Sequence, residues 1–114
     1  RLAGVTHECD FPAEAARLPR VTRSAVPAHA PPGEVDAAVR ALAAAGAPLD
    51  ALDEPAIAAL RPGVLLTQAL CDVCAVWEGD VRAVAERLPG APAVVTLGGT
   101  TLAGVADDVR RVAD

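Results

Sequence analysis

The chain has 114 residues, with ten Lys or Arg against fifteen Asp or Glu, and its net charge is -5 at neutral pH. A length of this order is typical of one domain, so the sequence predicts a single domain over 1–114. The charges of both signs are interspersed without the basic stripe that a phosphate backbone requires, and no apolar run approaches the roughly 20 residues that cross a bilayer. Nucleic-acid binding and a membrane span are therefore not expected.

Apolar runs and helical periodicity alternate along the chain. In chain order, the sequence predicts a strand over 1–6, a short helix over 12–18, a very short strand over 20–23, a helix over 34–45, an edge strand over 47–52, a helix over 54–60 capped by Asp53, the central strand 63–70, a helix over 79–88, a strand over 93–97 and a helix over 101–114. This alternation predicts an α/β fold, with a parallel sheet flanked by helices and right-handed crossovers. In the helix over 79–88, Val81, Val84 and Leu88 are expected to face inward.

Polar residues that could bind a ligand or a metal follow two of the predicted strands. His7 and Cys9 come after the first strand, and Cys71 and Cys74 come after the central one. Because parallel strands end at the same edge of a sheet, we expect the two loops to meet there, where open α/β sheets bind their ligands. This juxtaposition is the basis of the functional interpretation.

The same four residues form a candidate metal set. His7 and Cys9 are two apart and can face one point, and Cys71 and Cys74 have the spacing of a zinc knuckle. Three sulfurs and an imidazole suit zinc or another thiophilic metal. Two other interpretations stay open: the cysteines are small apolar residues while His7 bonds a backbone carbonyl, or Cys71 pairs with Cys74, or Cys9 with either, in a disulfide.

Three acids and one aromatic residue lie in the same loops. Glu8, Asp10 and Asp72 can accept hydrogen bonds from ligand amides or ligate a cation, or they are simply solvated. Trp77 offers a flat face on which a ligand can stack, or it belongs to the core.

Other signals are weaker. Arg20 belongs to a small basic group, with Arg17 and Arg23, that could hold an anion or be solvated. Gly98 and Gly99 precede a helix but lack a phosphate-loop pattern. The sequence contains neither a G-x-S-x-G nor an H-E-x-x-H motif, and no serine and histidine are placed as in a triad, so we predict no catalytic residues and no enzyme.

Three segments, 4–12, 18–24 and 66–76, resemble the cobalamin-binding proteins among the solute-binding proteins of ABC importers, a group that also includes iron-siderophore binders. The resemblance covers almost the whole chain. It implies a class III protein with two Rossmann-like lobes joined by a long helix. The chain would be an incomplete amino-terminal lobe, and 101–114 would be the start of the interlobe helix. Two features depart from the family: its opening strand and second lobe are missing here, and Gly98-Gly99 stands where relatives carry an acidic residue followed by proline.

The resemblance also implies a function. We expect a ligand-binding lobe for cobalamin or a related metal chelate, with the ligand in the cleft, a partner ABC permease, and a periplasmic or cell-surface location whose signal region lies outside this chain. No cofactor would be required. The expected ligand-binding residues are His7, Glu8, Cys9, Asp10, Asp72 and Trp77. A cysteine or His7 would coordinate the cobalt or a separate metal. The alternative is a zinc or thiol-redox protein that uses Cys9, Cys71 and Cys74.

Overall fold

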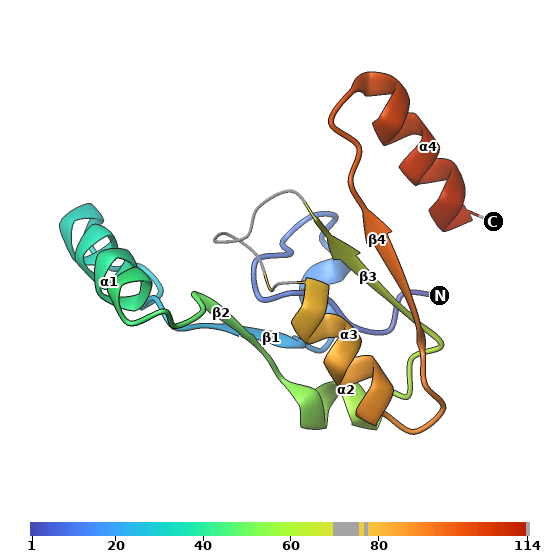
Figure 1. Cartoon of the computed structure of the whole chain (residues 1–114), viewed down its shortest axis with the longest axis horizontal. Helices are drawn as coiled ribbons and strands as arrows, with labels where there is room; N and C mark the ends of the chain where they lie inside the picture. The colour runs from blue at the N-terminus through green and yellow to red at the C-terminus, as the bar shows by residue number, and fades with distance from the viewer. Residues whose placement is uncertain (70–75, 77, 114) are drawn as a thin grey trace. The chain divides into compact units, whose positions relative to one another are not determined.

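The computed structural model describes residues 1–69, 76 and 78–113 (Figure 1). Strands and helices alternate in it, which confirms a mixed α/β fold. The chain divides into two compact units, Arg1–Arg61 and Pro62–Asp114. The expectation of one domain over 1–114 stays a prediction. Among the described residues, no helix is both long enough and apolar enough to cross a membrane.

The first unit contains a short antiparallel ribbon. Strand β1 (Thr22–Ser24) pairs with β2 (Asp50–Leu52), so that Thr22 lies opposite Leu52 and Ser24 opposite Asp50. A single 3-10 turn, η1 (Ala15–Arg17), precedes β1 and replaces the short helix expected over 12–18.

Helix α1 (Pro32–Ala44) connects the two strands of the ribbon. It begins with proline in its first turn and with Glu34, both of which favour a helix N-terminus. Val35, Val39 and Leu42 recur at helical spacing along α1 but are only half-buried, and no residue of α1 is fully buried.

Helix α2 (Glu54–Leu60) confirms the predicted cap. The Asp53 carboxylate accepts a hydrogen bond from the backbone N–H of Ala56 at 3.1 Å, which satisfies one of the free donors at the start of the helix. Ile57, on α2, is 2% exposed. The helix ends at Arg61, whose φ of +49° is in the left-handed region.

Residues 1–6 do not form the predicted strand. Val5 alone makes a parallel bridge, to Arg20. The ladder cannot extend on one side because Pro19 has no N–H to donate. On the other side, the next ladder bond would run from the N–H of His7 to the carbonyl of Val21. That N–H donates to Thr22 Oγ1 instead, and the carbonyl accepts from the N–H of Asp53.

The second unit contains a parallel pair of strands. Strands β3 (Val64–Gln68) and β4 (Ala93–Leu97) pair in register from the first residue of each to the last. Helix α3 (Glu78–Arg87) connects them and packs against both strands (Figure 1). Val81, Val84, Ala85 and Leu88 are buried, which confirms the inward face that the periodicity predicts.

The expected single parallel sheet is therefore present only in part. The β3–β4 pair is parallel and is flanked by helices, whereas β1 and β2 are antiparallel. Short polar strands such as β1 carry little information on pairing direction, because both arrangements satisfy their few backbone groups.

Helix α4 (Leu102–Ala113) is attached to the second unit through polar contacts. The carboxylate of Asp108 accepts from the N–H groups of Gly98 and Gly99, at 3.0 and 2.8 Å. The guanidinium of Arg111 donates to the carbonyl of Thr96 at 3.1 Å. The apolar residues at helical spacing along α4 are all exposed: Leu102, Val105, Val109 and Val112.

Candidate functional site

The first candidate loop, residues 6–10, starts from a fixed point. The backbone N–H of Val5 donates to the carbonyl of Pro19 at 3.0 Å, and the N–H of Val21 donates to the carbonyl of Val5 at 2.9 Å. The Val5 side chain is buried. The loop therefore leaves a rigid part of the first unit.

Arg20 holds the loop closed. The N–H of Cys9 donates to the carbonyl of Thr6 at 3.2 Å, which makes a turn. The Nη1 atom of Arg20 donates to the carbonyl of Thr6 at 2.8 Å and also to that of Cys9. One guanidinium thus bonds both ends of the turn. The Arg20 head group is engaged by the loop, whereas the sequence suggested an anion site or a solvated surface.

His7 is fixed by Thr22 on strand β1. The backbone N–H of His7 donates to Thr22 Oγ1 at 2.9 Å, and the ring Nδ1 lies 2.7 Å from the same oxygen. Thr22 Oγ1 therefore contacts both the backbone and the ring of His7. Thr22 is buried. His7 is thus held by a buried hydroxyl, whereas the sequence suggested a backbone carbonyl as its partner.

The Nε2 atom of His7 faces two carboxylates. Asp50 Oδ1 lies 3.6 Å away and Glu8 Oε1 lies 4.0 Å away. Asp50 is at the start of β2 and its side chain is mostly buried, whereas the Glu8 side chain is 85% exposed. Both separations are longer than a hydrogen bond.

The remaining residues of the loop have different environments. Cys9 is a half-buried free thiol whose Sγ lies 3.2 Å from Thr6 Oγ1. Asp10 is exposed. The loop consequently presents the Glu8 and Asp10 carboxylates to solvent, while Thr22 and Arg20 hydrogen-bond its backbone.

The second candidate loop lies outside the described residues. Cys71, Asp72, Cys74 and Trp77 belong to it, so the four-residue metal set and the meeting of the two loops stay predictions. Within the described part of the chain, no group of three or more His, Cys, Asp or Glu residues is arranged to hold a metal ion. His7 there has one nitrogen engaged by Thr22 and only Nε2 open to a further ligand.

The weak phosphate-loop candidate is explained by an internal carboxylate. The N–H groups of Gly98 and Gly99 point at the Asp108 carboxylate, which takes the position that an anion would occupy. A side chain at Gly99 would place its Cβ 2.6 Å from the backbone of Gly104, so glycine here serves a close approach of the loop to α4.

The partners of His7 could not be identified from the sequence. Thr22 and Asp50 are far from His7 along the chain, and a polar residue in a short strand gives no sign of its partner. The structure shows that Thr22 is a buried polar residue, and such a residue needs a hydrogen-bond partner. The sequence shows that Thr22 is polar but not that it is buried.

No known protein-family model, no curated protein and no solved structure matches the chain.

Proposed function

We propose that the chain is a ligand-binding lobe of an ABC-importer solute-binding protein for cobalamin or a related metal chelate. In this proposal the fold is one Rossmann-like lobe, without catalysis, that acts outside the cytoplasm with an ABC permease as its partner. The three segments that resemble the family support it. The single structural observation that supports it most is the held loop over 6–10, which presents polar groups from a rigid base.

The loop has the chemistry that a corrinoid requires. A corrinoid presents amide side chains around a flat ring, and the exposed carboxylates of Glu8 and Asp10 accept N–H groups of this kind. His7 adds a ring N–H, or a nitrogen ligand for cobalt, at Nε2. Because the backbone of the loop is fixed before ligand arrives, little ordering cost opposes binding. Trp77 would supply a stacking face from the second loop.

Isothermal titration of the intact protein tests the proposal. Cyanocobalamin and a ferric siderophore are titrated into the unaltered protein and into the double variant Glu8→Gln/Asp10→Asn. We expect saturable binding of at least one ligand and weakening of about tenfold in the double variant. Glu34→Gln, which removes an exposed acid on α1, is the matched control and should bind normally. No heat of binding with either ligand would overturn the proposal.

A zinc or thiol-redox protein is the second candidate, favoured by the free, half-buried thiol of Cys9. Elemental analysis of the purified protein and a thiol count under reducing and oxidising conditions separate the two. Stoichiometric zinc that disappears in Cys71→Ser would support this candidate against the binding lobe.

A further inference from the structure

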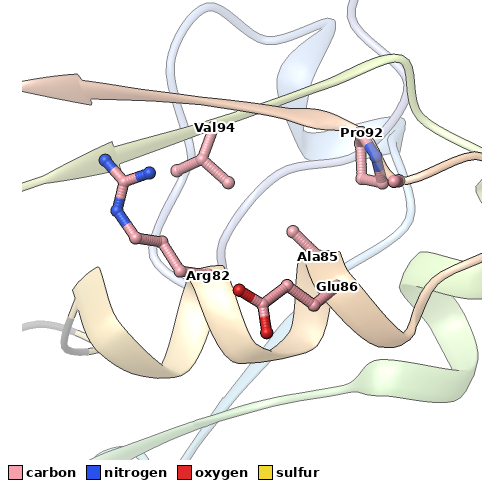
Figure 2. A pocket seen from close by; sticks show the side chains of 6 residues that line it. Arg82, Ala85, Glu86, Pro92 and Val94 are labelled. Atoms are coloured by element: carbon pink, nitrogen blue, oxygen red, sulfur yellow. The ribbon is translucent and has the colours of Figure 1, made fainter.

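A small pocket lies in the second unit, on the side of the sheet that α3 covers. Its volume is about 200 Å³, and Figure 2 shows the side chains that line it: Arg82, Ala85, Glu86, Ala91, Pro92 and Val94. The pocket is at the beginning of β4, whereas Gln68, the last residue of β3, lies at the other end of the same parallel pair. It is therefore separate from the edge at which the proposed chelate site lies.

The floor of the pocket is apolar and well packed. Ala85 on α3 is 5% exposed, Pro92 is buried, and Val94 on β4 is half-buried. The rim is formed by Ala91, whose φ of +41° is unusual for a residue with a Cβ. Its N–H donates to the carbonyl of Leu88 at 3.1 Å, so the turn that forms the rim is hydrogen-bonded to the end of α3.

The positive charge at the pocket is already compensated. Arg82 Nε donates to Glu78 Oε1 at 2.8 Å, and its Nη2 lies 2.6 Å from the same oxygen. The hydroxyl of Thr96 donates to this carboxylate at 2.7 Å, and together the Thr96 and Arg82 contacts lower the pKa of Glu78. Glu78 therefore stays ionised at neutral pH. The stem of Arg82 lines the pocket while its head is directed toward the strands (Figure 2).

The negative charge at the pocket is not compensated. Glu86 is exposed, and it forms no hydrogen bond or ion pair with any residue in the described part of the chain. In Figure 2 its carboxylate lies beside α3, next to the apolar floor. With the Arg82–Glu78 pair neutral as a whole, the pocket combines one free carboxylate with an apolar surface.

We propose that this pocket binds a primary ammonium group carried on a short aliphatic chain, with Glu86 as the anionic partner. The ammonium donates charge-assisted hydrogen bonds to the carboxylate. The methylenes cover Pro92, Val94 and Ala85 and exclude water from them. A volume of about 200 Å³ is smaller than the roughly 300 Å³ at which most ligand pockets begin, and it suits a chain of a few methylenes. The group can come from a free alkylamine or from a lysine side chain.

Two-dimensional amide NMR of the intact protein tests the proposal, with n-butylammonium as the probe and n-butanol and butyrate as matched ligands. We expect saturable shifts at Ala85, Ala91 and Val94 with n-butylammonium, and much smaller shifts with the other two. Glu86→Gln should weaken the binding about tenfold, whereas Glu34→Gln on α1 should leave it unchanged. Titration with a lysine blocked at both backbone ends, compared with n-butylammonium, distinguishes a protein side chain from a free amine as the better occupant.

Three outcomes would contradict the proposed ammonium site. Equal shifts with n-butanol, or unchanged binding in Glu86→Gln, would overturn the proposal, and so would the absence of shifts with n-butylammonium. Because Glu86 is exposed, the variant is expected to keep the fold, which the dispersion of the same spectra verifies. A failure here leaves cobalamin binding untouched, because the two sites share no residue.

Discussion

At the scale of residues, two buried or half-buried polar side chains determine the shape of the candidate loop. Thr22 accepts from the backbone of His7 and contacts its ring, and Arg20 bonds the carbonyls of Thr6 and Cys9. Neither residue reaches the exposed tip of the loop. Both act by positioning the residues that do, which is why their loss should alter stability and ligand affinity together.

Replacement of Thr22 tests this role. Thr22→Val keeps the shape of the side chain but leaves the N–H and the ring of His7 without their partner, at a cost of about 1–3 kcal/mol in the free energy of unfolding. Thr22→Ser keeps the hydroxyl and should lose less. Urea denaturation followed by circular dichroism gives both values. If the valine variant is as stable as the serine variant, the hydroxyl does not hold the loop.

Asp53 makes stability depend on pH. The backbone N–H of Ala56, followed by the guanidinium of Arg23, lowers the pKa of Asp53 in the folded state. A lowered pKa means that the unfolded chain binds more protons, so the contribution is present above about pH 4 and is lost as the pH falls through the lowered value. Asp53→Asn keeps a good N-cap without the charge. We expect it to flatten the fall in melting temperature below pH 4, and an unchanged slope would contradict this assignment.

At the scale of elements, the contact between the 98–101 loop and α4 requires the absence of a side chain at Gly99. A Cβ at Gly99 would lie 2.6 Å from backbone atoms of Gly104 and Val105, and backbone atoms cannot move aside as a flexible side chain can. At Gly98 the same addition meets nothing within 4 Å. The two neighbouring glycines therefore form a matched pair.

The two alanine variants should differ. Gly99→Ala is expected to destabilise the chain by about 1–3 kcal/mol through overpacking and to increase hydrogen exchange in α4, whereas Gly98→Ala should have a small effect. Thermal unfolding and amide exchange measure the two consequences. Equal behaviour of the pair would show that α4 is not packed on the loop in the way the contact requires.

Elements formed by interactions between residues close in sequence could be predicted, and those that depend on distant residues could not. The cap of α2 by Asp53 and the inward face of α3 are local patterns, and both could be predicted. The extent of the strand over 1–6 could not, because it depends on Pro19 and on the Thr22 side chain, more than ten residues away. For the same reason, the sequence indicated the candidate loop at His7 but not Thr22, which holds it.

At the scale of the whole molecule, apolar surface is concentrated in particular places. Among the described residues, half of the large apolar side chains that are strongly exposed belong to α4, where Leu102 is 92% exposed. Contiguous apolar surface of this kind marks an interaction site in most soluble proteins. Under the proposed function, 101–114 begins the interlobe helix, and its apolar face would be covered in the assembled binding protein.

The proposed function requires the loops after Val5 and after β3 to form one wall of a ligand site together. Reaction of the intact, reduced protein with a short bis-maleimide, followed by peptide mass spectrometry, tests it most directly. We predict an intramolecular cross-link between Cys9 and either Cys71 or Cys74. A product in which Cys71 is linked only to Cys74, while Cys9 carries an unbridged reagent, would contradict the claim.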